Sequence, residues 1–468
     1  MAEGSACGSP TVKTFAVFLL LLATAVATAA ASAVFDVRDF GAVGDGTTLE
    51  TAAMARAVAA ASRAGGGTVL VPPGRYLTGT IELKSHVTFE VAGGATILGS
   101  ENPADYPTTK SVWGDERNVM APLIHATDAE NITITGRGTI DGQGAIWWRR
   151  VRLNNPGKFP PGPQTDADRA EAAKLSRGRP QLISLIRCKD IVLERVNLLN
   201  SASWNVHPLL CDNVRIDGVT ITAPATMAHN TDGINPESCR NVQIINCRIT
   251  TGDDCGTLKS GRDKLGRRMG RPDENITIAN CVMGHGHGGV TIGSEMSGGV
   301  RNVVVTNCVF QETDIGIRVK AQRGRGGVVE GLSVSNIVMA DVPSPFTITT
   351  FYTGTDRPDA VYPVDEGTPR FRDFHFSHIT ARGAKTAGSI TGLREQPVEN
   401  ITFTDVQIES QTGFTVTNAR DIVFRDVRID TASGPALVTK NSRAVDTTRL
   451  TTALPHPDTP LVRDASAP

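Results

Sequence analysis

Aromatic residues are scarce in this chain, and neither sign of charge is in excess. Only 5% of the 468 residues are Phe, Trp or Tyr, and 47 Lys and Arg residues balance 48 Asp and Glu residues, which leaves a formal net charge of −1 at pH 7. A near-zero net charge argues against a protein that binds nucleic acid. No His or Cys cluster has metal-ligand spacing, so we expect neither a metal nor another cofactor.

Long apolar runs are also missing, except near the N-terminus. Lys13 precedes the segment FAVFLLLLATAVATAAASA, whose leucine-rich part is shorter than the roughly 20 apolar residues of a membrane span. The segment ends in a small-x-small cleavage pattern at Ala31-Ser32-Ala33. We therefore expect residues 1–33 to be a signal peptide and the mature protein to be secreted without a membrane attachment. The alternative is an uncleaved membrane anchor.

Cysteine is present in an odd number once the predicted signal peptide is removed. Cys7 lies in that peptide, so seven of the eight cysteines remain, and at least one of them is free or pairs with another chain. The secretory route permits disulfides. However, Cys247, Cys281 and Cys308 recur at one phase of a repeat, where small buried apolar residues are the alternative to disulfides.

A repeated strand pattern dominates the rest of the chain. The segments DIVLERVNLL, NVRIDGVTIT, NVQIINCRIT, NITIANCVMG and NVVVTNCVFQ begin at residues 190, 213, 241, 275 and 302, and each alternates apolar with polar residues after an Asn or Asp. Many glycines, 47 in all, accompany these strands and indicate many turns. A strand repeat of this length without helical periodicity predicts an all-β protein, a parallel β-helix with one coil per repeat.

Asparagines recur at one phase of this repeat. We expect them to stack on one another at a turn for a structural reason, and we exclude them from the active site. They are Asn246, Asn280, Asn307 and Asn336.

Two segments interrupt the strand pattern, and the end of the chain departs from it. The alanine-rich segment 48–67 has apolar residues at helical spacing and predicts a short helix that caps the N-terminal end of the solenoid. Residues 160–180 predict a polar loop with a short helix. We therefore expect one catalytic domain over residues 34–440. The tail 441–468 gains prolines and loses the alternation, so we expect it to be poorly ordered.

Charged residues recur about one coil apart in the middle of the chain. Asp232 precedes the pair Asp253 and Asp254 by about one coil, and His287 and then Arg318 and Lys320 follow in the next coils. Residues one coil apart are neighbours in space, so these side chains should form a column on one face.

Carboxylates that face a common gap are suited to acetal hydrolysis. One carboxyl group must donate a proton to the leaving oxygen, and another must be ionised to activate water. Three crowded carboxylates raise the pKa of one member and keep it protonated. Two carboxyl groups roughly 6.5–9.5 Å apart leave room for water and give a product of inverted anomeric configuration, whereas a separation of about 5–5.5 Å favours a covalent intermediate. The basic residues could hold an acidic sugar.

The motifs that carry these charges resemble those of the polygalacturonases, glycoside hydrolase family 28. They are NTDG at 230–233, GDDC at 252–255, GHGGVTIGS at 286–294 and RVK at 318–320, and FGAVGDG at 40–46, IDGQG at 140–144 and NSASWNVHP at 200–208 resemble flanking segments. The resemblance covers residues 35–352. It implies a right-handed, pectin-lyase-like β-helix and a monomeric enzyme of the cell wall that hydrolyses the α-1,4-galacturonosyl linkages of pectin with inversion.

The resemblance also implies a role for each matching residue. Asp253 is the expected general acid, Asp232 and Asp254 share the water as bases, and His287 completes the catalytic set. His285 competes with His287 in the same motif and is the alternative. The expected substrate-binding residues are Arg318, Lys320, Asn230, Lys259 and Tyr352.

Some positions depart from the family pattern and leave alternatives open. Gly256 replaces a large aliphatic residue, and Met283 stands where many endo-acting members have a cysteine, so Cys255 is either free or paired with Cys281. Endo or exo action stays open. The rival activities are a rhamnogalacturonan hydrolase, a calcium-dependent pectate lyase, and an inactive protein that binds wall polysaccharide.

Tryptophans and glycosylation sequons have less specific interpretations. The pair at residues 147–148 is either a sugar platform or a buried aromatic pair, and Trp204 is expected in the core. NIT sequons at Asn131, Asn275 and Asn400 permit a glycoprotein, although each also begins a strand. The basic segment 261–274 is either a solvated loop or a grip for a polyanion.

Overall fold

The computed structural model describes residues 33–111, 117–160, 162–353, 360–453 and 459–465, together with Gly4 and Gly8. The predicted signal peptide, residues 1–33, lies outside the described residues apart from residues 4, 8 and 33. Among the residues described, no helix is both long and apolar enough to cross a bilayer.

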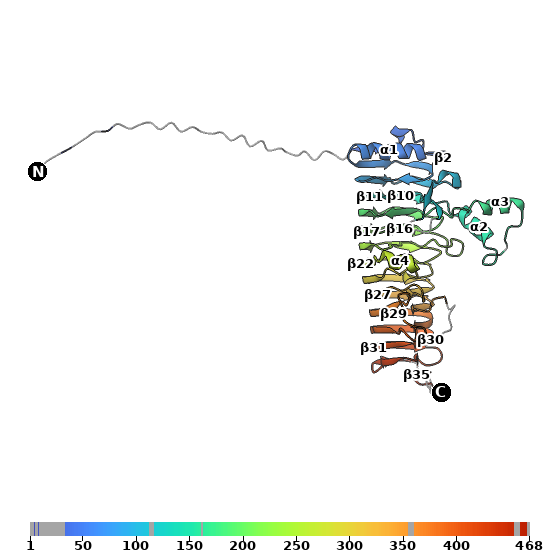
Figure 1. The fold of residues 1–468 in the computed structure, drawn as a ribbon, viewed down its shortest axis with the longest axis vertical. Helices are drawn as coiled ribbons and strands as arrows, with labels where there is room; N and C mark the ends of the chain where they lie inside the picture. The colour runs from blue at the N-terminus through green and yellow to red at the C-terminus, as the bar shows by residue number, and fades with distance from the viewer. Residues whose placement is uncertain are drawn as a thin grey trace.

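The chain coils into a parallel β-helix, as the strand repeat predicts. Figure 1 shows its strands stacked in layers along one long axis. The first stack runs, each strand parallel to the next, through β1 (Val34–Asp36), β3 (Gly67–Val71), β6 (Val87–Val91), β11 (Glu130–Gly136), β14 (Lys189–Glu194), β17 (Asp212–Asp217), β19 (Arg240–Ile245), β22 (Asp273–Ala279), β25 (Val300–Gln311), β27 (Val328–Ala340), β29 (Arg370–Thr391), β30 (Val398–Thr417), β31 (Ala419–Thr431) and β33 (Arg443–Asp446).

A second stack adjoins the first and merges with its long strands near β25. Its members are β2 (Asp45–Leu49), β4 (Gly74–Thr78), β7 (Ala95–Gly99), β12 (Thr139–Asp141), β15 (Asn197–Leu199), β18 (Thr220–Thr222), β20 (Arg248–Thr250), β23 (Val282–Met283) and, beyond the long strands, β34 (Leu450–Thr451).

The third stack brings the charged motifs, which are spaced about one coil apart in the sequence, onto one face of the coil. It comprises β5 (Ile81–Glu82), β10 (Ile124–Thr127), β13 (Ile183–Ile186), β16 (Val206–Leu209), β21 (Gly256–Leu258), β24 (Val290–Gly293), β26 (Ile315–Lys320), β28 (Ser344–Thr349), β32 (Leu437–Lys440) and β35 (Val462–Asp464). Parallel bridges from Ile234 to both Val206 and Gly256 carry the stack from β16 to β21.

Four helices and one antiparallel strand pair lie outside the strand stacks of the described residues. Helix α1 (Thr51–Arg63) lies over the N-terminal end and buries Met54, Ala57 and Val58, so the predicted cap is confirmed (Figure 1). Helices α2 (Ala145–Asn154) and α3 (Asp166–Ala173) project from one side, and α4 (Asp263–Met269) is shorter. Strands β8 (Thr108–Lys110) and β9 (Asn118–Met120) pair antiparallel, and the 3-10 turns η1 (Val37–Phe40) and η2 (Pro103–Asp105) complete the elements.

The interior is apolar because inward positions of each strand alternate with outward polar ones. Phenylalanines fill the C-terminal half, where Phe403 stacks between Phe376 and Phe424 with ring centroids 4.9 Å and 5.2 Å away. Trp147 and Trp148 are both buried, which supports the buried-pair alternative over a sugar platform.

Asparagine side chains stack at the turns, as expected. The Nδ2 of Asn280 donates to Oδ1 of Asn246 at 3.3 Å, and Asn336 donates to Asn307 at 3.2 Å. A second ladder includes the sequon residue Asn275, which donates to Asn241 at 3.2 Å and accepts from Asn302 at 3.0 Å. The Asn275 amide is therefore engaged in a structural contact.

The structure decides two open points. All seven cysteines from Cys188 to Cys308 are free and buried, so Cys255 is not paired with Cys281 and the thiols serve as small apolar residues. The boundary expected at residue 440 is too early, because β33, β34 and β35 pair parallel with β31 and β32 and extend the solenoid. These strands are only two to four residues long, too short to show an alternating pattern.

Candidate active site

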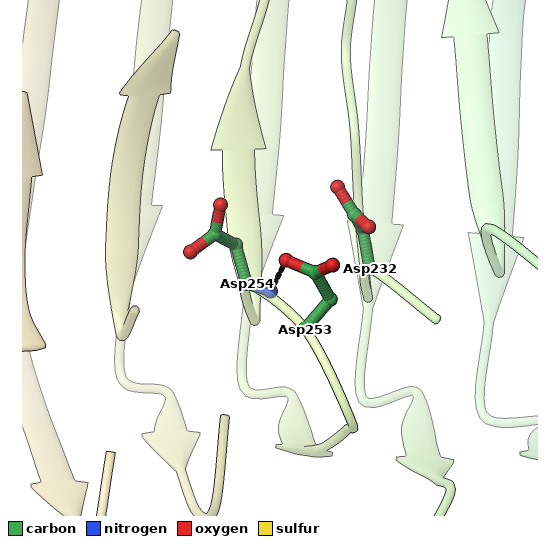
Figure 2. A group of neighbouring side chains, drawn as sticks. All are labelled: Asp232, Asp253 and Asp254. Carbon is green, nitrogen blue, oxygen red and sulfur yellow. Dashed lines mark hydrogen bonds between the residues drawn. The ribbon is translucent and has the colours of Figure 1, made fainter. Parts of the chain in front are cut away.

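The register of the third stack brings the predicted aspartates together. The backbone N–H of Gly233 donates to the carbonyl of Asp254 at 3.0 Å, so Asp232 lies one coil below Asp254, and Asp253 occupies the turn just before β21. One oxygen from each of the three carboxylates lies within 4.8 Å of the others. Figure 2 shows all three on the same side of the ribbon.

Exposure distinguishes the three carboxylates. The side chains of Asp232 and Asp254 are 5% and 2% exposed, whereas Asp253 is 18% exposed. Asp232 and Asp254 therefore form the floor of the site, and Asp253 is the member that reaches solvent.

Two cations clamp Asp254. The Lys320 ammonium lies 2.8 Å from Oδ2 and the Arg318 guanidinium lies 3.2 Å from Oδ1. The Tyr352 ring, 39% exposed, faces both cations at 5.2 Å and 5.5 Å from its centroid. Burial raises the pKa of Asp254, but the charges of Lys320 and Arg318 outweigh burial and lower it overall. Asp254 is therefore held as an ionised acceptor.

Among the described residues, one cation, that of Lys259, forms an ion pair with Asp232. Nζ of Lys259 lies 3.3 Å from its Oδ2, 3.6 Å from Oε2 of Glu295 and 4.1 Å from the centroid of Trp204. Complete burial raises the pKa of Asp232 to about 7, although the charge of Lys259 opposes the change. Lys259, expected to bind substrate, is buried and pairs with two carboxylates, those of Asp232 and Glu295, in the free protein.

Asp253 is bound on both of its oxygens. Oδ1 accepts the backbone N–H of Asp254 at 2.9 Å and lies 3.3 Å from Nδ1 of His287, while Oδ2 accepts Nδ2 of Asn230 at 3.4 Å. Burial raises the pKa of Asp253, but the hydrogen bond and charge of His287 and the charge of Lys320 lower it to about 2. The Asp253 hydrogen bond in turn raises the pKa of His287.

The structure shows which histidine of the motif faces the aspartates and what surrounds Gly256. His287 is the histidine that faces the aspartates, whereas Nδ1 of His285 is buried with no hydrogen-bond partner in the described part of the chain. A Cβ on Gly256 would meet its nearest atom, the carbonyl oxygen of Gly289, at an ordinary 3.8 Å. The site therefore has room for at least a Cβ at this position.

Two hollows lie near the aspartates, and the first is connected to them through Asn230, which lines it and donates to Asp253; none of the three aspartates lines either hollow. One, of about 670 Å³, is lined by residues that include Arg177, Arg179, Trp204, His207 and Asn230. The other, of about 580 Å³, shares Trp204 and Arg262 with the first and adds Lys264, Leu265 and Glu295. Among the described residues, the first hollow is lined by five Lys and Arg side chains and no carboxylate, so it suits an anionic ligand. The second is lined by three cations and three carboxylates and has no such preference.

Sequence reasoning misplaced one of these residues and missed two others. Trp204 is half-buried between the hollows and is not a core residue. Its position in the segment NSASWNVHP, beside motifs of the site, is the signal that could have indicated this. Glu295 and Arg179 were not singled out, and no periodicity in the sequence marks either of them.

Three carboxylate oxygens this close are also a possible set of ligands for a hard cation. Here the protein supplies its own positive charge, because Arg318 and Lys320 occupy both oxygens of Asp254 and Lys259 occupies Asp232. Cationic side chains therefore balance the negative charge of the cluster. In a metal-binding set of carboxylates, the ion itself would balance that charge.

Comparisons with known proteins find polygalacturonases among the proteins similar to this chain. The chain is 35% identical over 382 residues to a "Probable polygalacturonase" of Vitis vinifera, covering 79% of this chain and 73% of that protein. It is 31% identical over 356 residues to an "Endo-polygalacturonase" of Pectobacterium carotovorum subsp. carotovorum, covering 73% and 80%. A hyperthermoactive exopolygalacturonase structure from Thermotoga maritima superposes with a TM-score of 0.73 at 33% identity, covering 86% of this chain and 92% of that one.

A family model matches most of the chain. The model of glycosyl hydrolases family 28 matches residues 64–422, a range that includes every aspartate, histidine and cation of the site described above. The chain therefore belongs to glycosyl hydrolases family 28.

Proposed function

We propose that this protein is a polygalacturonase that hydrolyses the α-1,4-galacturonosyl linkages of pectin. The observation that carries the proposal is the cluster of three carboxylates within 4.8 Å of one another beside a hollow lined by arginines. Hydrolysis of an acetal needs a protonated and an ionised carboxyl group side by side. Galacturonate adds one carboxylate per sugar, which matches a cationic lining.

Asp253 is the proposed general acid because it is the carboxyl group that a bound chain can touch. Its pKa in the free protein, about 2, is lower than that of Asp232, about 7, so the unbound site keeps its proton on Asp232. A general acid must carry its proton before the reaction, so this order of the two pKa values is the reverse of the one that catalysis needs. A sugar that covers Asp253 removes water from it, and desolvation raises the pKa of a carboxyl group.

Asp254 and Asp232 are the proposed partners of the attacking water. Asp254 stays ionised between Lys320 and Arg318 and so accepts a proton from water. Because both of its oxygens are bound to cations, Asp254 is poorly placed to turn and attack the sugar itself. This clamp supports direct attack by water, which inverts the anomeric centre.

The carboxylate spacing does not support inversion by itself. The closest oxygens lie within 4.8 Å, which is below the roughly 6.5–9.5 Å typical of inverting glycosidases. Inversion therefore rests on the Asp254 clamp, and the anomeric form of the first product, followed by proton NMR, tests it. A first product with retained configuration would require a covalent intermediate and overturn the water-activating role.

Arg318 is the proposed cation for the substrate carboxylate. Its side chain is 16% exposed, one of its N–H groups faces Asp254, and a guanidinium has five donors. Lys320 is 9% exposed and lies closer to Asp254, so its proposed role is to hold the base. Tyr352 and Asn230, both exposed at the edge of the site, are the proposed further contacts to the sugar.

The proposed setting is extracellular, at the pectin of the cell wall, with the protein secreted and acting as a monomer. Product sizing of digests separates the finer alternatives. Monomers released from polygalacturonate indicate exo action and a ladder of oligomers indicates endo action. Faster cleavage of rhamnogalacturonan than of polygalacturonate would replace the proposed substrate.

A further inference from the structure

Arg179 lies in the loop before β13, outside the motifs that resemble the family. Its Nη1 donates to the backbone carbonyls of Ala202 at 2.8 Å and His229 at 2.7 Å, and its Nη2 donates to Oδ1 of Asn230 at 3.0 Å. Among the residues that the structure describes, no carboxylate pairs with it directly. Burial lowers its pKa to about 10, although the charges of Asp232 and Asp253 oppose this change.

The contact with Arg179 determines which way the Asn230 amide faces. A guanidinium has only donors, so the group that it meets must be the amide oxygen. The Nδ2 of Asn230 is thereby turned in the other direction, where it donates to Oδ2 of Asp253 at 3.4 Å. Asn230 itself sits at φ 56°, a left-handed conformation that asparagine tolerates well.

The hydrogen bonds of Asp253 indicate which oxygen carries the proton to be transferred. A carboxylate oxygen has two lone pairs. Oδ1 uses both, one for the Asp254 N–H and one for Nδ1 of His287 when that nitrogen is protonated. Oδ2 uses one for Asn230 and keeps one. The free lone pair on Oδ2 is the place for the acidic proton.

We propose that Arg179 is a positioning residue for the general acid, which acts through the Asn230 amide to fix the direction of Oδ2 on Asp253. The proposal rests on the role of Asp253 proposed above. Hydrogen bonds to an acid are often long in the free protein and shorten in the complex, as the 3.4 Å contact would have to do. Arg179 does not touch the substrate in this arrangement.

Arg179→Gln should lower kcat by about tenfold to a hundredfold with little change in KM, because a misdirected acid slows the chemical step. The matched control is Arg177→Gln, whose kcat should stay within about twofold of wild type even where loss of a cation from the hollow raises KM. Arg177 lines the same hollow and also donates to backbone carbonyls, those of Pro103 and Tyr106, but it does not reach Asn230. Thermal unfolding of both variants separates a fold defect from a catalytic one.

A double-mutant cycle tests whether Arg179 acts through Asn230. On an Asn230→Ala background, Arg179→Gln should change kcat by less than about twofold, since coupled residues are not additive. Equal losses on both backgrounds, or a raised KM with kcat unchanged, would overturn the proposal and make Arg179 a substrate contact.

Two further variants keep the test decisive if Arg179→Gln fails to fold. Asn230→Asp still accepts from Arg179 but turns a carboxylate toward Asp253, so its kcat should fall below that of Asn230→Ala at neutral pH. Arg179→Lys keeps the positive charge near Asp232 and Asp253. The pKa values read from the pH profile of kcat/KM should therefore stay unchanged, while kcat still falls. An Asn230→Asp enzyme as active as wild type would refute the positioning role.

Failure of the inference is distinguishable from failure of the proposed function. If the wild-type protein releases no new reducing ends from polygalacturonate, the proposed function fails regardless of Arg179. If Asp253→Asn retains activity, Asp253 is not the acid, and the role of Arg179 fails with it. If Asp253→Asn is inactive while Arg179→Gln behaves like Arg177→Gln, only the positioning role is wrong.

Discussion

Replacing Lys320 by Met tests the electrostatic design of the site most informatively. Met keeps much of the side-chain volume but removes the ammonium that lies 2.8 Å from Oδ2 of Asp254. Both side chains are buried, at 9% and 2% exposure, and breaking a buried ion pair by removing one partner costs about 3–5 kcal/mol. Arg318 remains on the other oxygen, so we expect the lower end of that range, about 3 kcal/mol, at pH 7.

The control is Lys84→Met, which removes the partner of Glu82 in an ion pair whose side chains are 46% and 51% exposed. An exposed pair contributes about 0–1 kcal/mol. Urea unfolding at pH 7 should therefore show a large loss of unfolding free energy for Lys320→Met and almost none for Lys84→Met. Similar losses in both variants would contradict the account of the clamp.

The contribution of Asp254 to the unfolding free energy changes with pH in a predictable direction. The pKa of Asp254 is lowered in the folded protein, so this carboxylate contributes stability above its unfolded pKa of 3.8 and loses that contribution as pH falls through the folded value. Lys320→Met removes the largest lowering charge. The gap in unfolding free energy between wild type and variant should therefore be widest near pH 7 and shrink toward pH 3. A gap of constant size would mean that packing, not charge, was lost.

Kinetics of the same variant decide a role that the sequence left open. From the sequence alone Lys320 is expected to bind substrate, whereas the structure engages it with Asp254. We therefore expect equal fold losses in kcat/KM on polygalacturonate and on methyl-esterified pectin. A loss confined to polygalacturonate would show direct contact between Lys320 and the sugar carboxylate.

Three other substitutions follow from the same geometry. Asp253→Asn should lower kcat by about 10²–10⁴-fold, as expected for loss of a general acid, with little change in thermal unfolding; near-normal turnover would remove it from that role. His287→Gln removes the hydrogen bond that lowers the pKa of Asp253. The alkaline limb of the kcat/KM profile should then move to higher pH, and an unmoved limb would mean that His287 does not tune the acid. Asn280→Ala loses a 3.3 Å ladder bond at a φ of 57° and should lower the urea unfolding free energy by about 1–2 kcal/mol; an unchanged value would show that the ladder is not stabilising.

Strand repeats made the fold predictable, because a coil that stacks on its neighbour must repeat its alternation of apolar and polar residues. The same repeat placed Asp232, Asp253, Asp254 and His287 together, since the spacing between motifs equals one coil plus an insertion. The register refines this placement, because Asp232 aligns with Asp254 and leaves Asp253 in the turn before β21.

Residues of the hollows were not predictable in the same way. Trp204 and Arg179 lie in loops, where exposure depends on which other loops fold over them and not on the strand period. Lys259 was expected at the substrate, but its burial and its pairing with Asp232 and Glu295 depend on side chains from separate coils. The pKa order of Asp232 and Asp253 likewise follows from burial and contacts that spacing does not encode.

The chemical nature of the products tests the central claim most directly. Wild-type protein and Asp253→Asn are incubated with polygalacturonate, with and without a strong chelator, and the digests are measured for new reducing ends and for ultraviolet absorbance. We predict saturated products with new reducing ends from the wild type, unchanged by the chelator and absent in the variant. Unsaturated, ultraviolet-absorbing products that disappear with the chelator would contradict hydrolysis and identify a metal-dependent lyase.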